Sequence, residues 1–211
     1  MPTSAETYTS LLMNLDSALG DEQCGKLGNW LALVEQGGRV MNLTGLKEPA
    51  ELAAELVVES LRLLGSGLPD SASVLDIGSG QGAPVIPLAV AAPQCSFLAV
   101  EVRQRRADFL LFAARRLRLA NLSVAACRVE ALPAAQSGPY DVVVSRAFAS
   151  PLEFIRIART LLSPAGEIRG ICGDSAAEIH SAAAAHGLIV DELYEYEHGG
   201  RRRISYRLNI S

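Results

Sequence analysis

From Ser73 onward, short runs of apolar residues alternate with longer stretches whose apolar residues recur every three or four positions. A short apolar run is typical of a buried strand, and the longer spacing is typical of an amphipathic helix. Strands are therefore predicted at 73–77, 96–101, 122–126, 140–145 and 167–172. Helices are predicted at 83–91, 104–119, 150–162 and 174–186. This alternation predicts an α/β fold, with a mostly parallel sheet and helices on both faces.

The two ends of the chain depart from this alternation. Residues 5–66 carry leucines at helical spacing, interrupted by glycines, and predict a set of helices. The apolar stretches 188–196 and 204–210 flank the polar turn His198-Gly199-Gly200 and predict an antiparallel hairpin at the sheet edge. We therefore predict two units, an N-terminal helical cap at 1–66 and a main domain at 67–211.

Charge is distributed unevenly along the 211 residues, although the formal net charge is only −4. Residues 1–100 hold 4 basic and 11 acidic side chains, a balance of −7, whereas residues 101–211 hold 15 arginines and 12 acids, a balance of +3. The arginines gather at 103–106, 115–118 and 201–207. Because a local field steers a polyanion more than the total charge does, an RNA-facing surface is one interpretation and a solvated face is the other.

Composition narrows the class of protein further. Hydrophobic residues make up 49% of the chain, which is enough for a substantial core and excludes a disordered protein. No apolar run has the length of a membrane span, and the N-terminus has no export signal, so a cytoplasmic protein is expected. The four cysteines and three histidines have no metal-ligand spacing, so no zinc site is expected.

The strongest chemical signal lies between the first predicted strand and the next helix. There Val74-Leu75-Asp76-Ile77 leads into Gly78-Ser79-Gly80-Gln81-Gly82. Glycines allow the backbone to turn sharply and to approach a ligand closely. Glu101 ends the second predicted strand, where an acid can accept hydrogen bonds from a ribose. The pattern predicts a nucleoside-bearing cofactor at the carboxyl edge of the sheet.

Two classes of cofactor compete for this loop. Dinucleotide sites prefer G-x-G-x-x-G, whereas Gly78, Gly80 and Gly82 are spaced as G-x-G-x-G. Asp76 would repel a pyrophosphate, but it would favour the ammonium group of S-adenosylmethionine. We therefore favour S-adenosylmethionine over a dinucleotide, with a tight turn that binds no ligand as the third interpretation.

Several segments resemble the bacterial RsmG (GidB) family. In chain order they are Asn42-Leu43-Thr44, 75–84 with Pro87-Leu88, Arg105-Arg106 before Phe109-Leu110, Arg128-Val129-Glu130, and 141–147. The resemblance implies a Rossmann-like class I methyltransferase with a mostly parallel seven-stranded sheet. It also implies S-adenosylmethionine-dependent methylation of N7 of a guanine in 16S ribosomal RNA near the decoding site. The expected partner is 16S rRNA or the small ribosomal subunit, and the chain is expected to act as a monomer.

The resemblance also implies roles for matching positions. Gly78, Gly80, Gly82 and Ala83 would line the methionine and ribose end of the cofactor, and Glu101 would hold the ribose. Val129 and Glu130 would meet the adenine. The cofactor-binding set predicted from loop and family together is Asp76, Gly78, Ser79, Gly80, Gly82, Ala83, Glu101, Val129, Glu130 and Arg146.

Arg146 is also the predicted catalytic residue, at the mouth of the active site. Guanine N7 carries a free lone pair, so we expect Arg146 to position substrate or cofactor and not to transfer a proton. Phe148 is the candidate for stacking on the target base, with a core position at a helix start as the alternative.

Departures from the family pattern fall where the substrate would be handled. Leu56 stands at a position where the family commonly has histidine, before Glu59-Ser60-Leu61, and Cys172 stands at a family lysine. Arg169 lies three residues too early to replace that lysine. Two alternatives therefore stay open, namely a methyltransferase acting on another RNA or a small molecule, and a cofactor-binding protein that docks on the ribosome without catalysis.

Overall fold

The computed structural model describes residues 3–15, 19–41, 44–148, 150–173 and 175–211. Asn42 and Leu43, which contribute to the family resemblance, lie outside the described residues. The helical N-terminal part comprises α1 (Ser4–Asn14), α2 (Asp21–Met41), α3 (Pro49–Ala53), η1 (Ala54–Val58), α4 (Glu59–Leu61) and η2 (Arg62–Leu64). The strands are β1 (Ser73–Ile77), β2 (Ser96–Val100), β3 (Leu122–Ala125), β4 (Tyr140–Arg146), β5 (Leu162–Cys172), β6 (Leu188–His198) and β7 (Arg201–Ile210). The remaining helices are α5 (Val85–Ala91), α6 (Gln104–Arg116), η3 (Val129–Ala131), η4 (Ala134–Gln136), α7 (Pro151–Arg159) and α8 (Ala176–Ala185).

Within the described residues, seven strands form one sheet in the order β3-β2-β1-β4-β5-β7-β6. Strands β1 to β5 pair in parallel, and β7 pairs antiparallel with both β5 and β6. The predicted mostly parallel sheet with a terminal antiparallel hairpin is confirmed. The order reverses between β1 and β4, and ligands of open α/β sheets bind outside the carboxyl ends of the strands at such a point.

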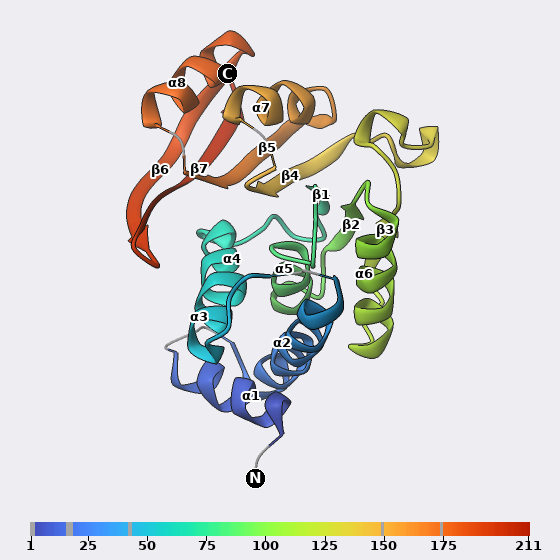
Figure 1. Ribbon diagram of the computed structural model, residues 1–211. Helices are drawn as coiled ribbons and strands as arrows, with labels where there is room; N and C mark the ends of the chain where they lie inside the picture. Colours follow the sequence, from blue (N-terminus) through green and yellow to red (C-terminus); the bar gives the residue numbers. More distant parts are fainter. Residues whose placement is uncertain (1–2, 16–18, 42–43, 149, 174) are drawn as a thin grey trace.

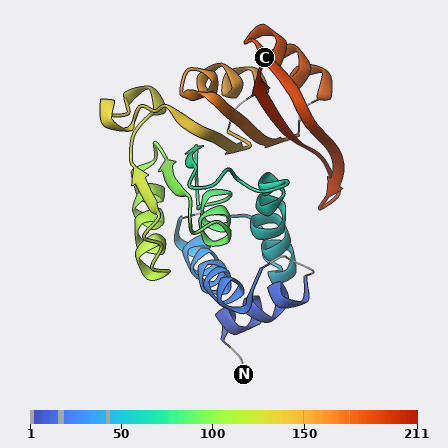
Figure 2. The same cartoon turned by 180° about the vertical axis from the view of Figure 1, so that it is seen from behind.

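Helices cover both faces of this sheet (Figures 1 and 2). Side chains alternate along each strand, so Val74 packs in one core and its neighbour Leu75 in the other. The first core joins the N-terminal helices to α5 and α6 through side chains such as Trp30 and Phe109. The second core packs α7 and α8 on the opposite face, with Phe154 at its centre. The N-terminal helices therefore extend one of the two helical layers.

Two elements differ from their predicted bounds. Strand β5 begins at Leu162, five residues before the expected start, because Leu162 pairs with Tyr140 ahead of an irregularity in the register. The hairpin β6–β7 is longer at its turn, so that His198 and Arg201 form the last cross-strand pair. The turn of this hairpin reaches the N-terminal helices, beside α4 in Figure 1.

The helix from Pro49 to Leu64 contains one wide, π-helical turn at η1. The Glu59 N–H donates to the carbonyl of Ala54, five residues earlier, where an α-helix would use Glu55. Wide turns of this kind occur frequently at functional sites. Among the described residues, no helix combines the length and apolar character that a membrane crossing requires.

Candidate cofactor and substrate site

The glycine loop closes over the carboxyl ends of β1 and β2. The N–H groups of Gly78 and Ser79 both donate to the Val100 carbonyl, at 2.9 and 3.1 Å. Gly78 and Gly80 have φ of +79° and +57°, which L side chains rarely adopt. An ideal Cβ on Gly78 would also lie 2.6 Å from Cδ2 of Phe148. A residue with a side chain at Gly78 would therefore distort the loop and displace the Phe148 ring.

Glu101 holds the loop in place from the end of β2. Its Oε2 accepts from the Gly80 N–H at 2.9 Å, and its Oε1 accepts from the Arg103 N–H at 2.8 Å. The side chain is buried, yet it lines a cavity. Each carboxylate oxygen has a second lone pair, so Glu101 can accept hydrogen bonds from a ribose while still fixing the loop.

Asp76 lies fully buried beneath the loop, and neither of its carboxylate oxygens has a hydrogen-bond partner among the described residues. Burial raises the pKa of Asp76 to about 7, and interactions with Ser79, Arg146 and the Val85 backbone oppose that rise. An unpartnered buried carboxylate is costly, so a cation beside it would be strongly favoured. A ligand with an ammonium group would supply that cation.

Two cavities meet at the loop. The first, of about 360 Å³, is lined by Glu101, Val129, Glu130 and Phe148. The second, of about 250 Å³, is lined by Ser79, Gly80, Ala83 and Arg146 among others. Both cavities share the lining residues Gly78, Arg106 and Ala147.

Most of the predicted cofactor residues therefore come together around these two neighbouring cavities. Asp76 and Gly82 line neither cavity. An ideal Cβ on Gly82 would lie 2.6 Å from Cδ1 of Ile86, so close packing of the loop against α5 already explains this glycine. A contact between Gly82 and a cofactor stays a prediction.

Arg146 ends β4 and points across the second cavity toward the wide turn of the N-terminal helix. Its Nη1 donates to the Glu55 carbonyl, which the wide turn has released from the Glu59 N–H. The same nitrogen lies 3.0 Å from Glu59 Oε2 and 3.6 Å from Glu55 Oε1. Among the described residues, the other guanidinium nitrogens of Arg146 make no hydrogen bond, and they can donate to a ligand.

Four charged or polar side chains near Arg146 were not predicted as site residues. Arg203 Nε lies 3.3 Å from Glu59 Oε1, and its Nη2 lies 3.4 Å from Glu55 Oε1. His198 Nε2 lies 3.3 Å from Glu55 Oε2. Together Glu55, Glu59, His198 and Arg203 join the N-terminal helix to the β6–β7 hairpin. Glu59 stood out only as part of a family-like segment, and the arginine run at 201–203 stood out only as charge.

Strand alternation explains how the hairpin brings these side chains together. Tyr196 pairs directly with Arg203, and His198 pairs directly with Arg201. Residues two apart on a strand share a face, so Tyr196, His198 and Arg203 all lie on the side toward the N-terminal helix. Tyr196 adds a hydrogen bond from its hydroxyl to Glu59 Oε1 at 3.1 Å.

The residues that depart from the family pattern have different surroundings in the structure. Leu56 is a buried core residue, and Cys172 is a buried residue at the edge of the second cavity. Arg169 is engaged elsewhere, because it donates to the carbonyls of Leu63, Leu64 and Gly67, as expected from its early position. Arg203 instead approaches the Cys172-Gly173 corner, since an ideal Cβ on Gly173 would lie 3.8 Å from its Nη1.

Phe148 lies at the wall of the first cavity and is not a core residue. Its side chain is 38% exposed and it precedes α7, so the core interpretation is wrong. The ring packs against Gly78 and lines the first cavity. This place fits contact with a cofactor at least as well as stacking on a substrate base.

The residues present fit S-adenosylmethionine. Glu101 offers acceptors for a ribose diol at the wall of the first cavity. Asp76 lines neither cavity, so its pairing with the ammonium group stays a prediction. Val129 and Glu130 line the far part of the same cavity, where a base would lie. A pyrophosphate in this cavity would meet the Glu101 carboxylate as a like charge.

Comparison with known proteins shows the family to which the chain belongs. The model of the GidB family, described as rRNA small subunit methyltransferase G, matches residues 23–200. The ribosomal RNA small subunit methyltransferase G of Burkholderia thailandensis is 37% identical over 178 residues, which cover 81% of this chain and 77% of the relative. The protein of the same name from Burkholderia lata is 37% identical over 163 residues, covering 75% and 71%.

Solved structures share the fold at lower identity. A SAM-dependent methyltransferase from Aquifex aeolicus superposes with a TM-score of 0.63 at 17% identity, covering 81% of this chain and 97% of that one. Magnesium protoporphyrin IX methyltransferase from Synechocystis, solved with bound SAM, gives a TM-score of 0.63 at 13% identity, covering 92% and 100%. The fold is thus that of the class I methyltransferases. With the family match spanning most of its length, the chain belongs to the GidB family, the rRNA small subunit methyltransferases G.

Proposed function

We propose that this protein transfers a methyl group from S-adenosylmethionine to N7 of one guanine in 16S ribosomal RNA. The observation that carries the proposal is the pair of cavities joined at Gly78, Arg106 and Ala147. One cavity has the acceptors for a nucleoside, and the other opens beside Arg146 toward the N-terminal helix and the hairpin. A cofactor held in the first cavity would present its reactive end to a base in the second.

The chemistry needs orientation more than acid or base catalysis. When bound, S-adenosylmethionine supplies an electrophilic methyl group and departs as a neutral thioether. Guanine N7 is already a nucleophile at neutral pH, so no side chain must first remove a proton. Correct orientation of two reacting groups can lower a barrier by roughly 7–11 kcal/mol. We assign that role to the loop and Glu101 on the cofactor side and to Arg146 on the substrate side.

The charge of the site suits a purine that becomes positive. Methylation at N7 leaves a positive charge on the guanine ring, which a lone arginine would oppose. Here the carboxylates of Glu55 and Glu59 pair with both Arg146 and Arg203. The four formal charges cancel, so the arginines can donate hydrogen bonds to the base or to a phosphate without placing net positive charge beside the ring.

A methylation assay tests the proposal. The purified protein is incubated with S-adenosylmethionine carrying a labelled methyl group and with small ribosomal subunits from cells that lack the modification. We expect one equivalent of 7-methylguanosine in 16S rRNA. Arg146→Ala should lower kcat/KM by about 100-fold, because a hydrogen bond from a charged group is worth about 1.5–3 kcal/mol.

The matched control for this assay is Arg156→Ala, which removes an exposed arginine of α7 on the far face of the sheet. It should leave kcat/KM within about twofold, since surface substitutions rarely exceed about 0.5 kcal/mol. Cofactor binding without any RNA methylation would favour the alternative of a ribosome-docking protein. Undiminished methylation by Arg146→Ala would contradict the role assigned to that residue.

A further inference from the structure

Glu55 differs from the other acids of the site because it lines two neighbouring spaces. It lies in the wide turn of the N-terminal helix and lines the second cavity, near Arg146. It also lines a larger groove of about 690 Å³, which runs between that helix and the β6–β7 turn. Arg146, Arg203 and Gln81 are shared by the two spaces. Glu55 therefore stands where a nucleotide entering along the groove would reach the reactive cavity.

The shortest side-chain contact of Glu55, 3.3 Å, is longer than the shortest contact of its neighbour Glu59, 3.0 Å. Its oxygens lie 3.6 Å from Arg146, 3.4 Å from Arg203 and 3.3 Å from His198, whereas charge-assisted hydrogen bonds are normally about 2.7–2.9 Å. Glu59 is 1% exposed and lies 3.0 Å from Arg146. Glu55 is 22% exposed. Glu59 is thus held in a buried position by its ion pair with Arg146. The charge of Glu55 is balanced by its neighbours, but its oxygens can still accept shorter hydrogen bonds from a ligand.

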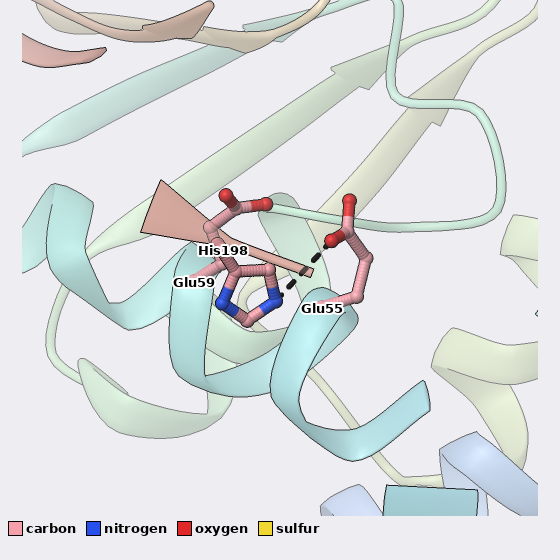
Figure 3. A group of neighbouring side chains, drawn as sticks. All are labelled: Glu55, Glu59 and His198. Atoms are coloured by element: carbon pink, nitrogen blue, oxygen red, sulfur yellow. Dashed lines mark ion pairs between the residues drawn. The ribbon is translucent and has the colours of Figure 1, made fainter. Parts of the chain in front are cut away.

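A metal ion is the first ligand to consider for this cluster. Figure 3 shows Glu55, Glu59 and His198 gathered together, and one ligand atom from each lies within 4.8 Å of the others. However, Arg146 and Arg203 already form ion pairs with both carboxylates. Two guanidinium groups beside the same oxygens would repel a divalent cation. A neutral hydrogen-bond donor fits the available oxygens of Glu55 better.

We propose that Glu55 recognises the Watson–Crick edge of the guanine that is methylated. This inference rests on the proposed function and names the residue that selects the base. Guanine presents two adjacent donors on that edge, the N1–H and the 2-amino group, which match the two oxygens of a carboxylate. Adenine, cytosine and uracil do not present two adjacent donors there. Enzymes that act on an extruded base commonly read it by this edge.

Recognition on this edge also assists the reaction. N7 lies away from the N1–H and the 2-amino group, so a base held by Glu55 keeps N7 free to face the cofactor cavity. As positive charge develops on the ring, the N1–H becomes a stronger donor, and its hydrogen bond to Glu55 strengthens. An interaction that is stronger in the transition state raises kcat and not only affinity.

A double-mutant cycle between protein and RNA tests this contact. Wild-type protein and Glu55→Gln are each assayed on small subunits whose 16S rRNA carries guanosine or inosine at the target position. Inosine lacks only the 2-amino group. We expect wild type to lose about 10- to 100-fold in kcat/KM on inosine, and Glu55→Gln to lose a similar factor on guanosine. The loss in kcat/KM of Glu55→Gln on inosine RNA should be at least about fivefold smaller than the product of the two single losses.

Glu51→Gln provides the matched control, because exposed Glu51 lines the groove one turn earlier and does not line the reactive cavity. Its preference for guanosine over inosine should equal that of wild type. Equal rates of the wild-type protein on guanosine and inosine RNA would overturn the proposed contact. Strictly multiplicative losses in the cycle would also overturn it. A wild-type protein that methylates neither RNA would overturn the proposed function together with this contact.

Discussion

Asp76 and Asp141 are two aspartates whose surroundings move their pKa values in opposite directions. Burial raises the pKa of Asp76 to about 7, and neither of its oxygens has a partner among the described residues. Asp141 accepts hydrogen bonds from the Ser73 N–H at 2.9 Å and the Ser73 hydroxyl at 2.8 Å, which lower its pKa. The ionised carboxylate of Asp76 therefore destabilises the folded protein, whereas that of Asp141 stabilises it.

The pH dependence of stability should reveal Asp76. The pKa of Asp76 is about 7 in the folded protein against its ordinary value of 3.8, so between these pH values the folded state keeps a proton that the unfolded state has lost. Its contribution to stability is therefore fully present below about pH 4 and is lost as pH rises through about 7. Asp76→Asn should remove this loss, worth on the order of 4 kcal/mol, in urea unfolding at pH 8 without cofactor.

The same variant should bind S-adenosylmethionine much more weakly in calorimetry, because the amide cannot pair with an ammonium. Asp141→Asn is the opposing control. The lowered pKa of Asp141 gives stability that is present above its unfolded value and is lost as pH falls. If Asp76→Asn bound the cofactor as tightly as wild type, the role of Asp76 would be disproved.

At the scale of elements, two contacts join the N-terminal helix to β4 and β5, in addition to those that the β6–β7 hairpin makes. One is the wide turn at η1, whose released Glu55 carbonyl accepts from Arg146 of β4. The other is Arg169 of β5, which is buried and donates to carbonyls of Leu63, Leu64 and Gly67 after that helix. Arg169 also pairs with Glu167 at 2.5 Å. These contacts set the distance between the helix and the hairpin, and hence the width of the site.

Arg169→Met should therefore be strongly destabilising. It removes one donor from each of three backbone carbonyls and from the Glu167 carboxylate, and breaking a buried ion pair typically costs about 3–5 kcal/mol. Urea unfolding at neutral pH measures the change. The comparison is Arg202→Ala, whose ion pair with Glu195 is exposed on the hairpin and should be worth about 0–1 kcal/mol. Equal effects of the two variants would show that Arg169 is not a structural tie.

At the scale of the whole molecule, the N-terminal helices and the sheet share one hydrophobic core. Leu27, Trp30 and Leu52 pack in the same cluster as Val74 and Phe109. Trp30 also donates from its indole nitrogen to the Gln81 carbonyl in the glycine loop, at 3.2 Å. The boundary between 66 and 67 stays a prediction, and we propose that the two units unfold together. Cytoplasmic location and a monomeric state also stay predictions.

Cooperative unfolding can be measured directly, because Trp30 is the single tryptophan of the chain. Its fluorescence reports on the N-terminal helices, and circular dichroism reports on all helices. With a shared core, both signals should give one urea midpoint, which saturating S-adenosylmethionine raises in both. At 100 times Kd the cofactor should add about 2.7 kcal/mol. Two separate midpoints would mean that the N-terminal unit is an independent domain.

Local patterns in the sequence determined the positions of the strands, the glycine loop and Glu101. Periodicity, turn residues and the end of an apolar run are properties of neighbouring residues, so they can be read without the fold. They also determined that Arg146 ends a strand at the ligand-binding edge of the sheet. The family resemblance added the identity of the cofactor pocket, and the comparisons agree with it.

Only the tertiary structure decided which side chains surround Arg146. Glu55 and Glu59 come from an N-terminal helix, whereas His198 and Arg203 come from a hairpin about 140 residues later, and no local pattern links them. They meet because β7 inserts between β5 and β6, and because residues two apart share one face of that hairpin. The position of Glu55 likewise depends on a wide helical turn that neither the spacing nor the composition of this segment predicts.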